Sequence, residues 1–356
     1  MKKLILGIET SCDETALALV EGSGSVTRPT FKIKKALVHS QILVHHPFGG
    51  VVPNLAKREH LINLPILLSK IDPKGTMMQE VDAIAVTVGP GLEPALWTGI
   101  EFAKTLAKAS KKPLIGANHL EGHLYSFILD WQKKKASSIF PAIALIASGA
   151  HTILLKMDSL MKWKNLGETR DDAVGEAFDK VGRLLGLPYP GGPEIEKLAV
   201  KGNCMAINFP QPMKYDKNYE FSYSGLKTSV LYYLRDLSPN PHTLSPKIRA
   251  DVAASFERAA TDVLVHKANR AIKEFGAKSI VLCGGVAANK QLRKKLSGLA
   301  KQHKIQLFVP EFKHNTDNAV MIAVAGYMTL LRKSAKGGSA SGGKKYPIRA
   351  NGNMGI

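Results

Sequence analysis

The stretch "GIETSCDETALALV", residues 7–20, starts apolar, passes through a run of acids and hydroxyls, and becomes apolar again. This pattern predicts two strands joined by a polar hairpin turn. A second stretch, "IALIASGAHTILLK" at residues 143–156, repeats the order of strand, small polar turn and strand. Two such units indicate a duplicated fold, although two unrelated hairpins would show the same pattern.

The rest of the chain alternates short apolar runs with stretches of helical period. Strands are predicted at 3–8, 83–88, 113–117, 142–147 and 279–283, and helices at 54–71, 94–109, 171–186, 245–275 and 317–333. This alternation predicts an α/β protein. Since a single core rarely grows to 356 residues, we expect two lobes.

Composition limits the class of protein. The chain has 45% hydrophobic residues but no run of about 20 apolar ones, so no membrane span is expected. Its formal charge of +20 favours a polyanionic partner such as RNA, with a solvated basic surface as the alternative. Three cysteines, Cys12, Cys204 and Cys283, form no CxxC pair, which suits the reducing cytoplasm.

The segment "NHLEGHLYSFIL" contains His119 and His123, four residues apart. On a helix they lie about 40° apart on one face, which is a spacing typical of metal ligands. A metalloprotease HExxH motif would place a glutamate directly after the first histidine, whereas Glu121 comes two residues later and points to nearly the opposite side. A third ligand is needed, and Asp317 is our candidate, with a plain helix cap as the alternative.

Paired glycines mark three further junctions. They are Gly284 and Gly285 before a helix, Gly191 and Gly192 between prolines, and Gly89 and Gly91 in "GPGLEPALWTG". A backbone without Cβ can approach a nucleotide closely, and a helix start favours anions. Asn289 follows the first pair and can reach a base or ribose, and Glu176 or Asp179 can point inward from the predicted helix at 171–186. Together these features predict a nucleotide site.

Ten motifs occur in the order of a known family. They are "GIETSCDET", "GGVVP", "GPGL", "NHLEGH", "SGAHT", "GEAFDK", "YPGGP", "FSYSGLKT", "GGVAAN" and "TDNAVMIA". From about residue 4 to about residue 330 the chain resembles the TsaD type of tRNA threonylcarbamoyladenosine transferase. The resemblance implies a duplicated actin-like or Hsp70-like ASKHA fold, with two lobes around a nucleotide and metal cleft. We expect one lobe at 1–117 with 318–335, the other at 118–317, and a flexible, basic, Gly/Ser-rich tail at 336–356.

The resemblance also implies an activity. Members transfer the threonylcarbamoyl group from threonylcarbamoyl-adenylate to the exocyclic amine of the adenosine just 3′ of the anticodon, in tRNAs that read codons beginning with A. Carried over by position, the metal ligands are His119, His123 and Asp317, and the acids nearest the chemistry are Asp13 and Glu14. The residues expected against the adenylate are Ile146, Ala147, Ser148, Gly149, Ala150, Asp179, Gly192 and Asn289.

The implied cofactor is one divalent metal ion per subunit, iron(II) before zinc, and ATP or a related adenine nucleotide can occupy the adenylate cleft. The implied partners are tRNA, an inactive paralogue of the TsaB type and a small ATPase of the TsaE type. Two departures from the family are Ala150, where most relatives have glycine, and Asn54, where they have glutamate. The rival interpretations are a metalloprotease, an ASKHA protein that binds ATP without transferase activity, and a tRNA-binding scaffold.

Overall fold

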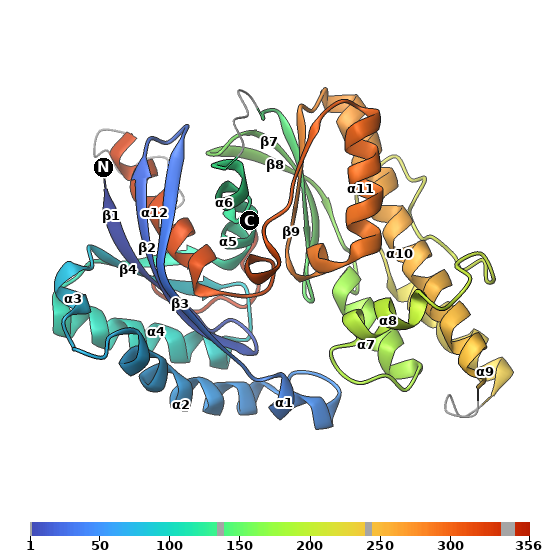
Figure 1. Ribbon diagram of the computed structural model, residues 1–356, viewed down its shortest axis with the longest axis horizontal. Helices are drawn as coiled ribbons and strands as arrows, with labels where there is room; N and C mark the ends of the chain where they lie inside the picture. Colours follow the sequence, from blue (N-terminus) through green and yellow to red (C-terminus); the bar gives the residue numbers. More distant parts are fainter. Residues whose placement is uncertain (1, 134–138, 239–243, 336–345) are drawn as a thin grey trace. The chain divides into compact units, whose positions relative to one another are not determined.

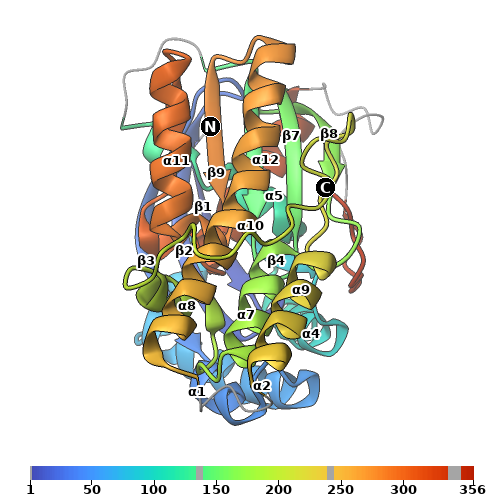
Figure 2. The ribbon, with the colours of Figure 1, turned by 90° about the vertical axis from the view of Figure 1, so that its right-hand side faces the viewer.

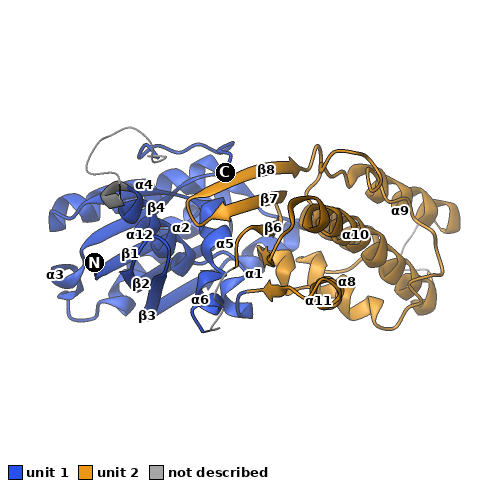
Figure 3. Ribbon diagram, turned by 90° about the horizontal axis from the view of Figure 1, so that it is seen from above, with its two compact units in different colours: residues 1–135, 310–356 blue, residues 136–309 orange. Residues whose placement is uncertain are grey.

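A computed structural model describes residues 2–133, 139–238, 244–335 and 346–356. The chain divides into two compact units, coloured separately in Figure 3. Unit 1 contains Met1–Lys135 and Pro310–Ile356, and unit 2 contains Ala136–Val309. Each unit is built on a five-stranded sheet with helices, so the predicted α/β class is confirmed.

The sheet of unit 1 has the order β3-β2-β1-β4-β5 (Figure 1). Its strands are β1 Lys3–Glu9, β2 Glu14–Gly24, β3 Pro29–Ser40, β4 Ala83–Gly89 and β5 Leu114–Asn118. The first three strands pair antiparallel, and β4 and β5 continue the sheet parallel to β1. All seven residues of β4 are buried, as expected for a parallel strand that is covered on both faces.

Helices cover both faces of this sheet. The longer ones are α2 Pro53–Ile71, α4 Glu93–Ser110 and α12 Ala319–Ala335, and the shorter ones are α1 Ile42–His45, α3 Met77–Glu80, α5 His119–Tyr125 and α6 Ile128–Trp131. Leu6 and Ile8 of β1 face the core that α2 and α4 complete. Gly7, between them, faces α12, where a Cβ atom would lie only 2.2 Å from the Ala319 carbonyl oxygen. Side chains alternate along a strand, so one strand serves both faces.

Unit 2 repeats this topology. Its sheet has the order β10-β9-β6-β7-β8, which from the other edge is third, second, first, fourth and fifth strand, as in unit 1. The strands are β6 Ala142–Ala147, β7 Thr152–Ser159, β8 Lys162–Glu168, β9 Ser279–Cys283 and β10 Gln306–Phe308. The helices are α7 Val174–Leu184, α8 Gly191–Ala199, α9 Ser224–Leu237, α10 Pro246–Phe275 and α11 Lys290–Gln302, and Figure 2 shows α10 and α11 in front of this sheet. The two hairpins quoted above are therefore equivalent parts of a duplicated fold.

The units begin and end at other residues than predicted. Residues 118–135 and 310–317 belong to unit 1, not to the second lobe. Helix α5 packs on α12 through the buried ion pair of Glu121 with Arg332. After α6, the Gln132 side chain exchanges two hydrogen bonds with the backbone of Phe31 in β3, at 2.8 and 3.0 Å. These tertiary contacts attach the segment to the first sheet.

The predicted flexible tail needs a correction. Residues 336–345 lie outside the described residues, but residues 346–356 pack on unit 1. Tyr346 forms an antiparallel bridge with Gly116 of β5, the Asn351 N–H donates to the Val88 carbonyl at 2.9 Å, and Ala350 is 8% exposed. Because this segment pairs with strand ends and has no period of its own, the sequence pattern did not reveal it. Within the described ranges, no helix is long and apolar enough to cross a membrane.

Asp171 gives unit 2 a pH-dependent stability. Its carboxylate accepts hydrogen bonds from the backbone of Tyr223 and Ser224 and from the hydroxyls of Ser222 and Ser224, at the start of α9. Burial raises the pKa of Asp171, but these hydrogen bonds outweigh it, and the pKa lies below the usual 3.8. A lowered carboxyl pKa contributes stability above the unfolded-state pKa, and the contribution is lost as the pH falls through the native value.

Asp171 is itself exposed, so solvent screens its charge, and Asp171→Asn should lower the free energy of unfolding by less than about 1 kcal/mol at pH 7 and by still less near pH 3. Urea unfolding at both pH values measures the difference. Asp236→Asn is the matched control, because the Asp236 side chain is 74% exposed. A deficit of equal size at both pH values would contradict the assignment.

Candidate metal centre

Two histidines lie on the seven-residue helix α5, His119 at its first position and His123 at its fifth. Asn118 caps this helix, since its side-chain oxygen accepts hydrogen bonds from the N–H groups of Leu120 and Glu121, at 2.8 and 3.2 Å. The rings of His119 and His123 lie 4.6 Å apart between centroids, and both residues are buried. The prediction that the pair shares one helix face is confirmed.

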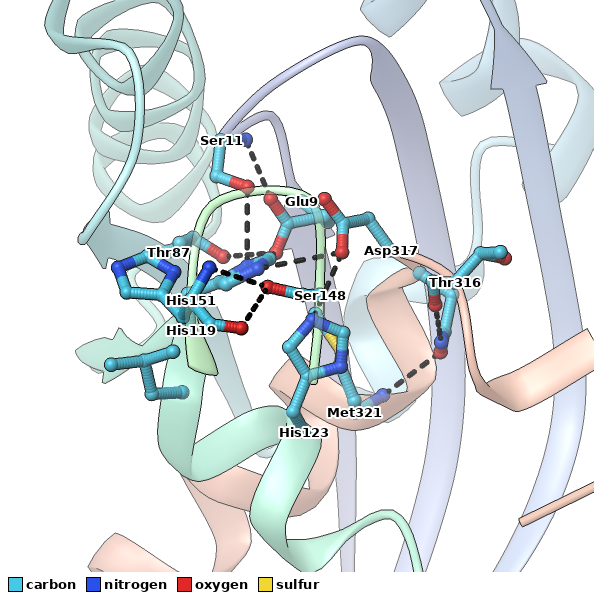
Figure 4. Close-up of polar contacts among 12 residues, drawn as sticks. Glu9, Ser11, Thr87, His119, His123, Ser148, His151, Thr316, Asp317 and Met321 are labelled. Atoms are coloured by element: carbon cyan, nitrogen blue, oxygen red, sulfur yellow. Dashed lines mark hydrogen bonds and ion pairs between the residues drawn. The ribbon is translucent and has the colours of Figure 1, made fainter. Parts of the chain in front are cut away.

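Asp317 completes the group. Asp317 is not the cap of α12, which was the alternative interpretation. The neighbouring Asn318 caps the helix, because its side-chain oxygen accepts a hydrogen bond from the Met321 N–H. Asp317 Oδ1 instead lies 3.4 Å from His119 Nε2 and 3.0 Å from His123 Nε2 (Figure 4). One ligand atom from each of the three residues lies within 4.8 Å of the others.

Glu9 orients His119 from behind. His119 Nδ1 lies 3.2 Å from Glu9 Oε2 and 3.1 Å from the Ser11 hydroxyl. Glu9 is itself held by the Thr87 hydroxyl at 2.7 Å and by the Ser11 N–H at 2.5 Å. A carboxylate at Nδ1 holds the ring proton there and leaves Nε2 free to act as a ligand, a common arrangement around metal-bound histidines.

The sequence reasoning missed Glu9 and Thr87. Glu9 is the first of seven consecutive residues, 9–15, that are all polar except for Cys12. The sequence does not show which of them faces His119. Thr87 lies in β4, in an apolar run that indicates only a buried strand. The positions of Glu9 and Thr87 in the sequence do not indicate that the two side chains meet, because only the parallel pairing of β1 with β4 brings them together.

The residues fit a metal ion. Both ring nitrogens of His123 are buried: Nε2 faces Asp317 Oδ1 at 3.0 Å, whereas Nδ1 has no hydrogen-bond partner among the described residues. An unpaired buried nitrogen is costly unless another group binds it. Two imidazole nitrogens and one carboxylate oxygen are ligands that zinc and iron accept, with further positions open to substrate or water.

The charges in the group support each other. Burial lowers the pKa of His119, but the carboxylates of Asp317 and Glu9 outweigh it and raise the pKa to about 10. Burial raises the pKa of Asp317, yet the two imidazoles outweigh that effect and hold the pKa well below its usual range. In the absence of an ion a proton on His119 thus balances the acids, and a divalent cation can replace that proton.

Asp13 and Glu14 lie in the turn that follows Ser11. Asp13 is buried, and its carbonyl oxygen accepts a hydrogen bond from the Gln41 N–H at 2.9 Å. Burial raises the pKa of Glu14 well above its usual value, and the carboxylates of Asp13 and Asp317 add to the shift. Burial likewise raises the pKa of the Cys12 thiol, with Asp13 and Asp317 adding to it. A thiol held protonated is a poor nucleophile, so Cys12 is no candidate for covalent catalysis.

Glu121 faces away from the histidines. Its carboxylate binds Arg332 Nη1 at 3.1 and 3.2 Å and accepts a hydrogen bond from the Tyr346 hydroxyl at 2.7 Å. A metalloprotease needs a carboxylate beside the ligands to act as a general base. Glu121 is committed to an ion pair on the other face of α5, so this observation speaks against the protease interpretation.

One of the predicted glycine junctions serves packing instead. Gly91, at φ +153°, lies so close to the turn after β1 that a Cβ atom would be 2.6 Å from the Ser11 carbonyl oxygen. The Leu92 N–H donates to the same oxygen at 2.8 Å. Because Gly91 has no Cβ atom, the loop before α4 can pack against the turn that carries Ser11. This packing explains the glycine without a nucleotide contact.

In unit 2 five of the predicted adenylate residues, Ile146 to Ala150, lie at the carboxyl end of β6 and in the turn after it. Ile146 and Ala147 end β6 and are buried, whereas Gly149 and Ala150 in the following turn are exposed. Ser148 closes this turn, because its hydroxyl accepts a hydrogen bond from the His151 N–H at 3.0 Å. Gly284, at φ +89°, allows the end of β9 to lie against Ala147, where a Cβ atom would be 2.4 Å from the carbonyl oxygen.

The remaining predicted residues of unit 2 already have partners in the protein. The Asp179 carboxylate accepts a hydrogen bond from the Gly191 N–H at 2.8 Å and so links α7 to α8. Asn289 caps α11 through the Leu292 N–H and donates to Glu257, at 2.8 and 2.7 Å. A Cβ atom added at Gly192 would be in ordinary contact with Phe178 Cβ, at 4.0 Å. Their contacts to an adenylate stay predictions.

Comparison with protein families places this geometry in context. Residues 32–324 match the family model described as TsaD, tRNA N6-adenosine threonylcarbamoyltransferase. A protein of that name from Thermosipho melanesiensis is 49% identical over 325 residues, which are 91% of this chain and 94% of the relative. Another of the same name, from Fervidobacterium nodosum, is 48% identical over 324 residues, 91% of this chain and 92% of the relative.

Solved structures show the same fold at low identity. HypF from T. kodakarensis aligns with a TM-score of 0.59 and 15% identity, over 94% of this chain and 48% of that protein. Component A of the (R)-2-hydroxyglutaryl-CoA dehydratase of Acidaminococcus fermentans aligns with a TM-score of 0.50 and 13% identity, over 93% of this chain and 99% of that protein. These likenesses confirm the predicted duplicated ASKHA fold.

Proposed function

Because the chain belongs to the TsaD family of tRNA N6-adenosine threonylcarbamoyltransferases, we propose that it transfers a threonylcarbamoyl group from threonylcarbamoyl-adenylate to tRNA. The chain is a transferase. The acceptor is the exocyclic amine of the adenosine just 3′ of the anticodon, in tRNAs that read codons beginning with A. The observation that carries the proposal is the convergence of His119, His123 and Asp317, with Glu9 behind His119.

His119, His123 and Asp317 would hold a divalent ion, iron(II) before zinc. The approach of His123 Nε2 to Asp317 Oδ1 and the carboxylate at His119 Nδ1 support this assignment. When bound, the ion supplies a Lewis acid that anchors the threonylcarbamoyl group and polarises its oxygens.

The residues of the chain then need only to orient the substrates and to accept one proton from the adenosine amine. The adenylate is a mixed anhydride, so the acyl carbon is already activated and no enzyme nucleophile is required. We assign proton uptake from the attacking adenosine amine to Asp13. Burial raises the pKa of Glu14, so this carboxyl stays protonated to a higher pH than an ordinary glutamate and is less available as a proton acceptor.

The turn after β6 would lie against the leaving adenylate. Ser148, Gly149 and Ala150 follow the buried end of the strand, and a Cβ atom added at Gly149 would meet no other atom within 4 Å. Asp179, Gly192 and Asn289 would hold the nucleoside, while ATP or a related nucleotide can use the same residues. Ala150 adds a methyl group where most relatives have glycine, and Asn54 lies at the second position of α2.

The target adenosine lies in a single-stranded loop, so little pairing energy is lost when the base enters a site. The +20 formal charge favours binding of the phosphates. A TsaB-type paralogue and a TsaE-type ATPase are the proposed protein partners, and the cytoplasm is the proposed compartment.

The test is a transfer assay with purified protein, threonylcarbamoyl-adenylate and tRNA, with and without the two partners. Nucleosides from digested tRNA are analysed by mass spectrometry. We expect threonylcarbamoyladenosine at the anticodon loop, and a loss of product after chelation that is restored by iron(II). Unmodified tRNA in the complete mixture would contradict the proposed activity, and full activity in the chelated protein would contradict the metal.

Glu9→Gln should lower metal affinity by about 10- to 100-fold without unfolding the protein. A glutamine amide can donate to His119 Nδ1, which moves the ring proton to Nε2, the atom that faces Asp317. Metal titration of the variant measures the loss. Glu101→Gln is the control, because Glu101 is exposed and pairs only with Lys104 among the described ion pairs. Wild-type affinity in Glu9→Gln would rule out the orienting role.

A further inference from the structure

The segment 346–356 follows the ends of the central strands of unit 1. The Asn351 N–H donates to the Val88 carbonyl at the end of β4, and the Gly352 carbonyl accepts from the Gly91 N–H at 3.3 Å. The Gly352 N–H donates to Glu93 Oε1, also at 3.3 Å, at the start of α4. The segment is thus fixed at the same edge of the sheet from which α5 departs.

Two of its contacts reach α5 itself. The Tyr346 hydroxyl donates to Glu121 Oε1 at 2.7 Å, on the helix face opposite the two histidines. The Asn118 side-chain amide donates to the Gly355 carbonyl oxygen at 2.8 Å. Because that amide nitrogen is held, the other end of the carboxamide points its oxygen at the first N–H groups of α5. The segment therefore contacts both the cap and the middle of this helix.

A helix of seven residues cannot hold its own position. Its orientation depends on its cap and on tertiary contacts, and the direction of both imidazoles follows from it. Arg332 of α12 fixes Glu121 from one side, and Tyr346 from another. Without Tyr346 and Gly355, α5 would keep the Arg332 pair but lose one hydrogen bond at Glu121 and the anchor of its cap.

We propose that the segment 346–356 is a positioning element of the metal centre, which acts through Tyr346 on Glu121 and through Gly355 on Asn118. It sets the direction in which α5 presents His119 and His123. This inference depends on the proposed metal site, and it adds to that site a part of the chain that lies beyond the family match at residues 32–324.

The test uses Co²⁺ as the probe, because its visible absorption reports ligand geometry. The variants are Tyr346→Phe, which keeps the ring and removes only the hydroxyl, and a chain shortened to end at Met354, which removes the Gly355 carbonyl. We expect the Co²⁺ dissociation constant to rise about tenfold in each variant and further in the combination, with a changed absorption spectrum. Tyr215→Phe is the control, because Tyr215 is 78% exposed and lies in unit 2.

Thermal unfolding of the metal-free proteins separates positioning from plain stabilisation. A segment that only stabilises unit 1 would lower the Tm of the metal-free variants and leave their Co²⁺ dissociation constants and spectra as in wild type, which would overturn the inference. If wild-type protein itself fails to bind Co²⁺, the proposed metal site falls and this inference falls with it. If wild type binds and both variants bind equally well, only the positioning role is refuted.

Discussion

His123→Ala is expected to lower metal affinity by more than about 100-fold and to abolish threonylcarbamoyl transfer. The change removes one of the three candidate ligand side chains, and even residues behind metal ligands typically account for 10- to 100-fold in affinity. Within the described residues, His123 Nε2 contacts Asp317 Oδ1 at 3.0 Å, so the polar contact that is lost belongs to the candidate ligand group itself. Metal content by elemental analysis, together with the tRNA assay, measures both effects.

His46→Ala is the matched control for that change. His46 is exposed at the end of α1 and is not one of the three clustered ligand side chains. We expect wild-type metal content and activity in this variant. If His123→Ala kept its metal and its activity, the proposed centre would be wrong, whereas loss of metal with full activity would show that the ion is not needed for transfer.

Arg332→Met should destabilise the protein by about 3–5 kcal/mol, the largest loss of stability that we expect from a single ion pair here. Glu121 and Arg332 have side chains only 1% and 9% exposed. Removing the guanidinium leaves a carboxylate buried with one remaining hydroxyl partner, Tyr346. Urea unfolding of the metal-free protein at pH 7 measures the difference in free energy.

Two further variants test whether the loss of stability in Arg332→Met comes from the buried ion pair. Lys133→Met breaks the exposed pair with Glu311, whose side chains are 58% and 48% exposed, and should cost less than about 1 kcal/mol. The double change Glu121→Leu with Arg332→Met removes both charges and should recover much of the loss. A loss in Arg332→Met no larger than that in Lys133→Met would contradict the buried pair as an anchor of α5.

Local sequence patterns were sufficient for most of the elements. The observed β1, β4, β6 and β9 differ from the predicted strands by at most one residue at each end. A short apolar run bounded by polar residues is typical of a buried strand, so its limits can be read from the sequence. The helix predicted at 245–275 agrees with α10 to within one residue, because Ser245 caps its start and Gly276 ends it, and capping depends on one or two neighbouring side chains. The helix predicted from residue 54 begins one residue earlier, since Pro53 takes the first position of α2.

The residues of the candidate site also fall into two groups, those that local sequence patterns predicted and those that only the tertiary structure revealed. The i, i+4 spacing was enough to place His119 and His123 on one helix face, because helix geometry is local. Motif order then singled out Asp317, which spacing alone left open. Glu9 and Thr87 could not be found in this way, since their contact with each other depends on the pairing of β1 with β4 across about 80 residues.

By itself the sequence determined the duplicated α/β fold and the family, and it singled out three candidate ligand residues, because strand and helix periods and ordered motifs are properties of neighbouring residues. Only the tertiary structure decided that Glu9 lies beside Nδ1 of His119, that Glu121 pairs with Arg332 away from the two histidines, and that residues 346–356 pack beside α5. Those contacts join segments up to 237 positions apart. Their energy comes from burial and hydrogen bonding between elements, which no local pattern of residues records.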